Sequence, residues 1–474
     1  MCGIFGLIRS ENDTSVWNLP FVAVNGLAAL QHRGTESTGI VGSDGKCREH
    51  VEIVKGHGLV RDVLKEEAIQ KLNECRLVIG HNRYSTAGKK KSGINCVQPF
   101  VVYTARGIIA IAHNGELVDA SKKRIELMQE GVGLSTDTDS ELIAQMIAKA
   151  IALNVKCQSD PGDISKELAV TMSALNMSYS LLVLTYDRIY AVRDPFGNRP
   201  LCVGSIMNQA SSIAYCAASE SCAFPANSKF EFEVQPGEIV ELGAKGIRSV
   251  CQMKPQNRQA MCIFEYVYFA RNDSVIEGQQ IETVREECGR ILACEDSVRA
   301  DIVGNVPDSS LSAAIGYSSA SGIPYEPCLH RNTYVGRSFI QPSPQMREHA
   351  IMTKFGVLKK KVHNKSIVLV DDSIVRGNTM KILVRMLKDS GAAQVHLRIA
   401  SPPVKFPCFM GINIPTKDEL IAASKSIEQI RDFVGADSVQ YLSVEGLTKA
   451  VQKGIEKRSG HCTACLTGEY PVEI

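Results

Sequence analysis

The sequence predicts an α/β protein in two parts, the first rich in antiparallel strands and the second built on a parallel sheet. At 474 residues the chain is too long for one hydrophobic core. Its first half holds many short apolar runs separated by turn signals, whereas its second half alternates strand and helix patterns. That alternation is typical of a doubly wound sheet. The polar stretch 254–259 has the composition of a linker, so we divide the chain near residue 255.

Strands of the first half are predicted from runs rich in β-branched residues. The runs are 77–80, 107–112, 180–184 and 189–192, and a turn at 235–237 leads into a closing strand at 238–241. Two helical patterns interrupt them, at 22–30 and 139–151. The second helix places its large apolar residues on one face.

Strands of the second half are predicted at 300–303, 366–370 and 394–399, with helical patterns between them. A helix at 380–390 stops at Gly391, since glycine commonly ends helices.

Composition excludes several classes of partner. Lysine and arginine total 53 against 51 acidic residues, a net charge of +2, so neither nucleic acid nor a membrane surface is expected to bind. No apolar run has the length of a membrane span, and the N-terminus lacks a secretory signal pattern. We expect a cytoplasmic protein whose 16 cysteines serve as thiols, metal ligands or catalysts rather than disulfides.

Cys2 follows the initiator Met1 directly. Once Met1 is removed, this residue carries both a thiol and a free α-amino group. The amine can act as the base for the thiol, because its ordinary pKa of about 7.7–8.0 lies near neutral pH. The alternative is an incidental cysteine that packs or oxidises.

Three further groups in the first half suit a nucleophile that attacks a carbonyl. Asn114 and Gly115 follow a predicted strand and offer donors for an oxyanion. Arg83 has a guanidinium that fits a carboxylate, and Asp139 stands at a helix start, where it can pair with an ammonium. Taken singly, Asn114-Gly115 is more often a hairpin turn and Asp139 more often a helix cap.

Together these residues resemble a known family. The segments 1–6, 31–34, 81–86, 113–116, 139–141 and 193–195 are similar in order and spacing to the glutaminase domain of N-terminal-nucleophile amidotransferases. The resemblance covers about residues 2–245. It implies a four-layer αββα fold in which Cys2 attacks the glutamine amide and releases ammonia from a thioester. It also implies that Arg83 binds the glutamine α-carboxylate, that Asp139 binds its α-amino group, and that Asn114 and Gly115 form the oxyanion hole.

The strongest motif of the second half is 368–379. A buried strand ends in Asp371 and Asp372, at the edge where open parallel sheets bind ligands. A loop containing Ser373 and Gly377 then leads into a helix whose first amides form an anion cradle. Carboxylates facing such a cradle fit ribose hydroxyls or Mg²⁺. The alternative is an Asp-rich turn that only caps the helix.

This motif resembles the type I phosphoribosyltransferase signature for 5-phosphoribosyl 1-pyrophosphate (PRPP). The resemblance implies that Asp371 and Asp372 hold the ribose and Mg²⁺, that Ser373 belongs to the same loop, and that Arg376, Gly377, Asn378 and Thr379 wrap the 5′-phosphate. Segment 307–310 is similar to the pyrophosphate and metal loop, with Ser309 at the metal-contacting position. Segment 331–340, including Arg337, is similar to the loop that closes over PRPP, and Lys354 matches a phosphate-binding lysine. Thr333 stands where the family usually has arginine, and Asn272 where it usually has proline.

Cys462 and Cys465 form a C-x-x-C pair that suits zinc, a redox pair or an iron–sulfur half-site, and spacing alone does not identify further ligands. Segments 261–266, 407–411 and 461–465 resemble the [4Fe–4S] subgroup of amidophosphoribosyltransferases. That resemblance implies that Cys262, Cys408, Cys462 and Cys465 hold a structural cluster, with zinc as the alternative.

The expected function follows from both resemblances. Glutamine is hydrolysed at Cys2 and the ammonia displaces pyrophosphate at C1 of PRPP, giving 5-phosphoribosylamine and glutamate, the first committed step of purine synthesis. The resemblance implies purine nucleotides as feedback inhibitors and a homodimer or homotetramer. The expected domains are 2–250, 260–445 and a C-terminal tail, 446–474. The alternatives are an amidotransferase of another class and an inactive regulatory paralogue.

Overall fold

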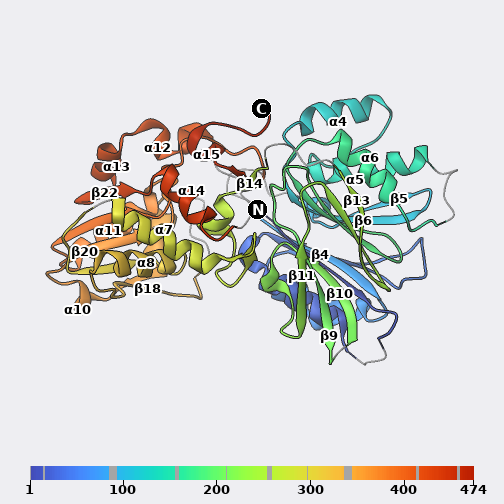
Figure 1. The fold of residues 1–474 in the computed structure, drawn as a ribbon, viewed down its shortest axis with the longest axis horizontal. Helices are drawn as coiled ribbons and strands as arrows, with labels where there is room; N and C mark the ends of the chain where they lie inside the picture. Colours follow the sequence, from blue (N-terminus) through green and yellow to red (C-terminus); the bar gives the residue numbers. More distant parts are fainter. Residues whose placement is uncertain are drawn as a thin grey trace.

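The computed structural model describes residues 2–13, 17–84, 93–154, 160–209, 211–253, 259–295, 297–335, 344–412, 416–455 and 460–474, without the side chains of 344–347. The chain forms two lobes that lie side by side (Figure 1). Within the described residues, no helix has both the length and the apolar character needed to cross a membrane.

The N-terminal lobe contains two antiparallel sheets. The first has the order β11 (Ser228–Glu233), β9 (Cys202–Asn208), β10 (Ser211–Ala218), β1 (Gly3–Arg9), β4 (Leu77–Arg83), β2 (Ser37–Ser43) and β3 (Glu52–His57). The second has the order β13 (Gly246–Gln252), β12 (Glu238–Gly243), β8 (Ile189–Arg193), β7 (Tyr179–Leu184), β6 (Gly107–Gly115) and β5 (Phe100–Thr104).

These sheets stack face to face and are covered by helices on their outer faces. Ile4, Ile79, Leu182 and Val240 belong to a buried cluster that lies between the sheets. Helix α1 (Leu19–Ala29) packs on the first sheet, and helices α5 (Asp139–Leu153) and α6 (Ser165–Ala174) pack on the second. The order is therefore helix, sheet, sheet, helix, which is the expected αββα arrangement. Other helices of this lobe are α2 (Val60–Val63), α3 (Glu66–Ile69) and α4 (Ala120–Gln129).

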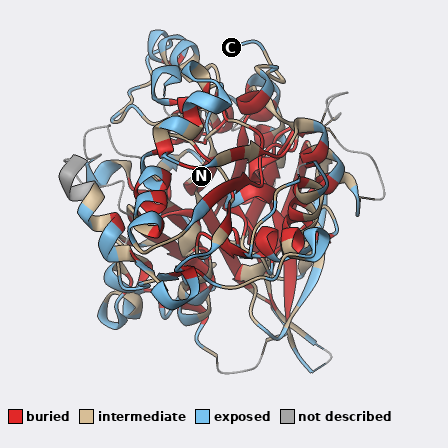
Figure 2. Ribbon diagram, turned by 90° about the vertical axis from the view of Figure 1, so that its left-hand side faces the viewer, coloured by how far each residue is buried: buried red, intermediate tan, exposed pale blue. Residues whose placement is uncertain are grey.

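The C-terminal lobe is built on a parallel sheet of order β17 (Ile302–Asn305), β20 (Ser366–Asp371), β21 (Gln394–Ile399) and β22 (Ser438–Tyr441). Helices α7 (Ile281–Glu295), α8 (Leu311–Ser321) and α14 (Val444–Gln452) cover one face. Helices α11 (Asn378–Asp389) and α13 (Ile427–Val434) cover the other. Figure 2 shows the buried strands between more exposed helices. Burial on both faces explains why these strands are continuous apolar runs.

Short elements complete this lobe. They are α9 (Pro344–Lys354), α10 (Lys359–Val362), α12 (Ile421–Ser424), α15 (Ala464–Thr467), and the strand pairs β15 (Val275–Ile276) with β16 (Gln279–Gln280) and β18 (Leu329–Arg331) with β19 (Phe355–Val357). A further pair, β14 (Met261–Cys262) with β23 (His461–Cys462), is parallel and sets Cys262 opposite Cys462. A π-helical turn, Glu265–Phe269, follows β14.

The predicted elements are present, with shifted ends. The helix expected at 22–30 is α1, which begins earlier because Asn18 caps it by accepting from the Phe21 amide at 2.9 Å. The strands expected at 77–80 and 107–112 extend to Arg83 and Gly115 and so include the polar residues that follow each apolar run. Most of the predicted linker, 254–258, lies outside the described residues.

Candidate active sites

The ends of several elements of the N-terminal lobe meet around Cys2. Cys2 stands just before β1, and β1 pairs with β4 so that Gly3 lies opposite Asn82. The backbone nitrogen of Cys2 donates to Oδ1 of Asn114 on β6, across 3.0 Å. Cys2 itself is half-buried. The structure thus brings Cys2 and Asn114 together although they are far apart in sequence.

Asn114 and Gly115 are strand residues, so the hairpin-turn alternative is wrong. They pair with Ser180 and Tyr179 on β7. The amide Nδ2 of Asn114 is buried and has no hydrogen-bond partner among the described residues. A buried donor without a partner is costly unless it serves a ligand. This amide is therefore suited to an oxyanion that forms beside Cys2.

Asp139 begins helix α5, and its cap is Thr138, so the helix-cap alternative for Asp139 is wrong. One oxygen, Oδ2, accepts from the Leu117 amide at 3.0 Å. The other, Oδ1, lies 3.8 Å from Nδ1 of His113. Burial lowers the pKa of the His113 imidazole, and the charges of Asp139 and Cys2 oppose that shift. His113 is therefore a neutral ring that lies close to both predicted site residues.

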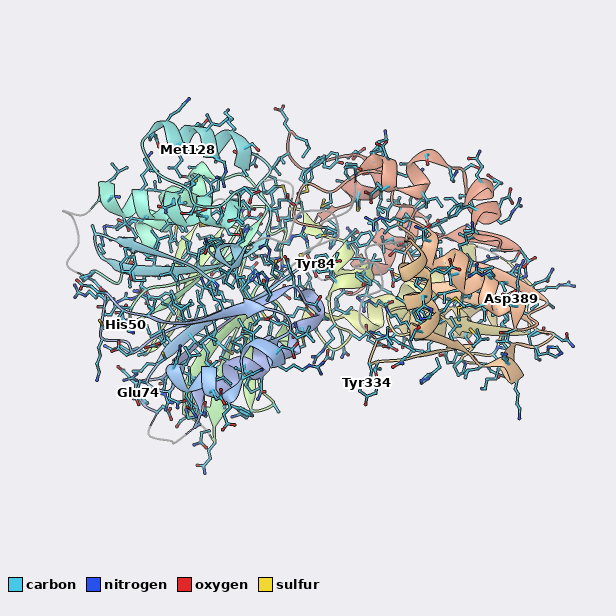
Figure 3. The ribbon with its side chains drawn as sticks, turned by 180° about the vertical axis from the view of Figure 1, so that it is seen from behind. His50, Glu74, Tyr84, Met128, Tyr334 and Asp389 are labelled. Atoms are coloured by element: carbon cyan, nitrogen blue, oxygen red, sulfur yellow. The ribbon has the colours of Figure 1, made fainter. Side chains whose placement is uncertain are left out.

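Arg83 ends β4 on the same side of the lobe. Its Nε lies 3.4 Å from a carboxylate oxygen of Glu36, and its Nη1 donates to the Cys96 carbonyl at 3.1 Å. The predicted motif continues into residues 85–86, which lie outside the described residues. Tyr84, the next residue along, lies at the junction of the two lobes (Figure 3).

The second predicted site lies at the carboxyl end of β20. The Asp372 amide donates to Oδ1 of Asp371 at 2.9 Å, and the Ser373 hydroxyl donates to Asp372 at 2.6 Å. Burial and the neighbouring Asp372 charge raise the pKa of Asp371 well above its usual range. Burial also raises the pKa of Asp372, against hydrogen bonds from Ser309 and Ser373. Ser309 therefore belongs to the same site, as the sequence predicts.

The loop after these carboxylates leads into helix α11. Gly377 takes a left-handed φ of 77° directly before the helix, where a side chain would be strained. Asn378 and Thr379 form the exposed first turn. Arg376 points instead to Glu419, with Nε at 2.8 Å from its carboxylate. The first amides of α11 thus form an open anion cradle, with Arg376 held at its side.

The remaining predicted PRPP residues lie on neighbouring segments. Lys354 ends α9, and its carbonyl accepts from the Asn332 amide at 2.8 Å. Thr333 lies in the turn that follows, next to the almost fully exposed Tyr334. Arg337 lies outside the described residues. Arg331 pairs with Asp308 of the predicted pyrophosphate loop at 2.7 Å.

The four predicted cysteine ligands come from three segments and meet near the junction of the lobes. Burial, followed by neighbouring thiols, raises the pKa of Cys465 well above its usual range. Burial raises the pKa of Cys262 to about 11 and of Cys462 to about 12, while Arg199 opposes both shifts. The Met410 amide donates to Sγ of Cys408 at 3.4 Å.

These thiols fit a soft metal group by their chemistry. They are clustered, largely buried and close to a cation that offsets thiolate charge. In the parts of the chain that the structure describes, no three His, Cys, Asp or Glu side chains have the spacing of a site for one metal ion.

Sequence reasoning missed a buried ionic network between the lobes. It consists of Arg33, Arg199, Glu220 and Glu265, all fully buried. Arg33 bonds both glutamates, and Arg199 lies 3.8 Å from Glu265. The signal that could have revealed it is Glu265 within the apolar run 263–267, because a lone carboxylate there requires a partner.

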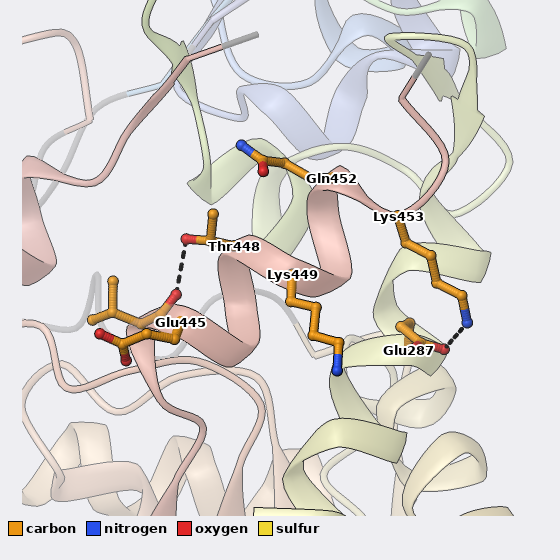
Figure 4. Close-up of a pocket in the computed structure, with 7 residues that line it drawn as sticks. Glu287, Glu445, Thr448, Lys449, Gln452 and Lys453 are labelled. Atoms are coloured by element: carbon orange, nitrogen blue, oxygen red, sulfur yellow. Dashed lines mark hydrogen bonds and ion pairs between the residues drawn. The ribbon is translucent and has the colours of Figure 1, made fainter. Parts of the chain in front are cut away.

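A surface depression lies away from these sites. It is lined by Glu287 of α7 and by Val444, Glu445, Thr448, Lys449, Gln452 and Lys453 of α14 and the following residue (Figure 4). Lys453 pairs with Glu287 there at 2.9 Å. None of the predicted site residues lines this depression, so the chemistry is not located there.

Comparisons with known proteins agree with the geometry of both lobes. The sequence model of a protein family, described as "Glutamine amidotransferase domain", matches residues 81–225. The amidophosphoribosyltransferase of Mus musculus is 46% identical over 509 residues, covering 100% of this chain and 98% of the relative. That of Bacillus subtilis is 41% identical, covering 100% and 94%. The solved structure of glutamine PRPP amidotransferase from B. subtilis, complexed with ADP and GMP, has a TM-score of 0.86 at 40% identity, covering 100% of this chain and 98% of that one.

Fold and sites define a glutamine amidotransferase joined to a phosphoribosyltransferase. The chain belongs to the amidophosphoribosyltransferase family. It is a glutamine-dependent pentosyltransferase that carries out the first step of purine synthesis. Similarity over the whole chain excludes the other amidotransferase classes, which would share only the first lobe.

Proposed function

We propose that Cys2 is the nucleophile that hydrolyses glutamine. The observation that carries this role is the contact between the Cys2 nitrogen and Asn114, whose unpartnered Nδ2 is buried beside Gly115. In the mature chain the α-amino group takes the proton from the thiol, and the thiolate attacks the side-chain amide of glutamine. Asn114 Nδ2 and the Gly115 amide stabilise the oxyanion of the tetrahedral adduct. As the adduct collapses to a thioester, the α-ammonium of Cys2 returns its proton to the departing nitrogen, which leaves as ammonia. Water then hydrolyses the thioester to glutamate and frees Cys2.

We assign residues around Cys2 to bind the α-ammonium and the α-carboxylate of the substrate glutamine. Asp139, whose Oδ1 faces the neutral His113 ring, binds the α-ammonium. Arg83 binds the α-carboxylate and exchanges its contact with Glu36 for the substrate. Charge complementarity at both ends of the substrate supports these roles.

The ammonia then attacks C1 of PRPP at the second site, and pyrophosphate leaves. Asp371 and Asp372 hold the ribose hydroxyls, and the cradle formed by residues 373 and 376–379 holds the 5′-phosphate. Ser309, Lys354 and Arg337 are assigned to the pyrophosphate side. Mg²⁺, held by the two carboxylates and Ser309, would neutralise charge that develops on the leaving group.

Replacement of Cys2 tests the division between the sites. Cys2→Ala is expected to abolish glutamine-dependent formation of phosphoribosylamine and to keep activity with free ammonia. Asp372→Asn is the converse variant: it is expected to lose both activities while Cys2 still reacts with iodoacetamide. Equal loss of both activities in Cys2→Ala would refute the assignment.

A structural [4Fe–4S] cluster is proposed at Cys262, Cys408, Cys462 and Cys465, with zinc as the alternative. The charge of Arg199 and the clustering of buried thiols support it. Such a group would tie the β14–β23 pair to segment 408–411 and supply no redox step. Iron content and the visible spectrum of anaerobically purified protein distinguish the two metals.

Further proposals concern regulation and assembly. Purine nucleotides are proposed as feedback inhibitors that use the same phosphate cradle, and the ADP and GMP bound to the B. subtilis relative support this. A homodimer or homotetramer in the cytoplasm is proposed, with domains 2–250 and 260–445 and a tail, 446–474. Light scattering and nucleotide titration of activity test these points.

A further inference from the structure

The backbone of the C-terminal lobe touches Gly115 directly. Gly411 has a left-handed φ of 93°, and a Cβ built there would lie 2.8 Å from the carbonyl carbon of Gly115 and 3.1 Å from the Glu116 nitrogen. On Gly115 itself, a Cβ would lie 2.1 Å from the Ser178 oxygen and 2.8 Å from Nε2 of His113. The strand end that carries the proposed oxyanion donor is thus packed between its own lobe and Gly411.

A second connection joins Cys2 to the C-terminal lobe through Arg33, a residue of the N-terminal lobe. Nε of Arg33 donates to the Cys2 carbonyl at 2.9 Å. The other two nitrogens of Arg33 bond the two carboxylate oxygens of Glu265, at 3.0 and 2.8 Å. Both side chains are fully buried, and Glu265 begins the π-helical turn of the C-terminal lobe. A planar fork held in this way has little freedom to move.

Arg199 connects the two contacts. Its Nη1 lies 3.8 Å from Glu265, and its Nη2 donates to the carbonyl of Met410, the residue before Gly411. Since Arg199 is fully buried, its charge depends on these partners. Glu265 and segment 410–411 are therefore linked through one guanidinium.

We propose that Glu265 and Gly411 are positioning residues for glutamine hydrolysis. Glu265 holds Cys2 through Arg33, and Gly411 fixes Gly115 from the opposite side. Neither residue touches the substrate. The hydrolytic geometry exists only while the C-terminal lobe holds both. This inference rests on the proposed roles of Cys2 and Gly115.

The first test is Gly411→Ala in the full-length chain. The added methyl displaces Gly115, and a misplacement near 1 Å at a reacting centre costs about 100-fold in rate. The kcat with glutamine is expected to fall by about 10- to 100-fold, with the KM for glutamine changed by less than about twofold. Activity with free ammonia stays at the parental level, because the second site is untouched.

Gly435→Ala is the matched control. Gly435 has a similar left-handed φ of 76°, but a Cβ there meets nothing within 4 Å. It therefore reproduces the backbone strain without the contact. Its ratio of glutamine-dependent to ammonia-dependent activity is expected to equal that of the parent protein.

Glu265→Gln is the second variant and needs no change in side-chain size. It removes the charge that holds Arg33. The rate at which iodoacetamide alkylates Cys2 is expected to change several-fold, together with a lower kcat for glutamine. This readout does not depend on turnover, and it stays informative if Gly411→Ala fails to fold.

Three outcomes would overturn the inference. The first is a glutamine-to-ammonia activity ratio in Gly411→Ala equal to that of Gly435→Ala. The second is a parallel loss of both activities, which indicates a merely structural contact. The third is an unchanged ratio and alkylation rate in Glu265→Gln. Glutamine-dependent activity in Cys2→Ala would instead refute the proposed function, so the two failures are distinguishable.

Discussion

Glu220→Gln is expected to lower the free energy of unfolding of the N-terminal lobe by about 3–5 kcal/mol. Glu220 is fully buried, and both of its oxygens are used. Oε1 accepts from His32 at 2.8 Å and from Arg33, and Oε2 accepts from the Arg271 amide at 2.8 Å and the Ser274 hydroxyl at 2.6 Å. The glutamine side chain introduced by this substitution accepts through one oxygen only. Its NH₂ group must therefore face either the donors of His32 and Arg33 or those of Arg271 and Ser274.

The magnitude follows from two losses. Each buried donor left without an acceptor costs about 1–3 kcal/mol. Breaking a buried ion pair by removing one charge costs about 3–5 kcal/mol. The second value includes much of the first, so they are not added.

The assay uses the single tryptophan of the chain. Trp17 lies in the N-terminal lobe with the Arg9 guanidinium 4.8 Å from its ring, so its fluorescence reports unfolding of that lobe. The urea midpoint of Glu220→Gln is expected to fall by about 1–2 M. Asp432→Asn, which removes an exposed ion pair with Arg431, is expected to leave the midpoint unchanged.

The pH dependence gives an independent check. Burial alone would raise the pKa of Glu220, but the charges of His32 and Arg33 outweigh it and hold the pKa well below its usual range. A carboxyl with a lowered pKa stabilises the folded state above its unfolded pKa, about 4.3, and loses that effect as the pH falls further. The difference in free energy of unfolding between the parent protein and Glu220→Gln is therefore at its full value at pH 7, and it decreases below about pH 4. A difference that is small at pH 7 or grows in acid would refute the reasoning.

Other changes test the second lobe. Asp372→Asn is expected to abolish PRPP use yet raise the melting temperature of the ligand-free protein at pH 7, because a carboxyl with a raised pKa destabilises the fold above its unfolded pKa; a lower melting temperature would contradict this. The KM for PRPP of the parent protein is expected to rise as the pH falls and Asp371 and Asp372 become protonated, which initial rates across pH would detect. Gly289→Ala is expected to destabilise the protein by several kcal/mol, since a Cβ there would lie 1.9 Å from the Ala313 oxygen and force α7 away from α8; thermal unfolding beside the open-space control Gly435→Ala measures it. Cys465→Ala is expected to lose bound iron and lower the thermal midpoint, and retention of full iron content would refute its role as a ligand.

Much of the fold could be predicted from local pattern. The strand and helix of the PRPP motif were expected at 366–370 and 380–390 and were found as β20 and α11, because burial on both faces makes such strands continuous apolar runs. The order of strands in the two antiparallel sheets could not be predicted. The pairing of β1 with both β4 and β10 depends on tertiary packing that local pattern does not contain.

Individual candidate site residues could be proposed from sequence motifs, but the contacts that hold these residues in place could not. Cys2, Asn114 and Asp372 each carry chemistry in their residue type, so a motif indicates them. Glu265 and Gly411 act through contacts with residues far away in the sequence. Glu265 meets Arg33, and Gly411 meets Gly115, only after both lobes have folded. Such long-range contacts produce no pattern in the local sequence from which they could be predicted.

The pairing of β14 with β23 has a consequence for how the protein matures. Ribosomes deliver residues in order, and domains generally fold as they emerge. Cys262 and Cys408 therefore appear well before Cys462 and Cys465, so the four-thiol set stays incomplete while both lobes are already synthesised. Loading of the proposed cluster would then follow synthesis of residue 465. A chain interrupted earlier leaves β14 without its partner strand and lacks two of the four thiols.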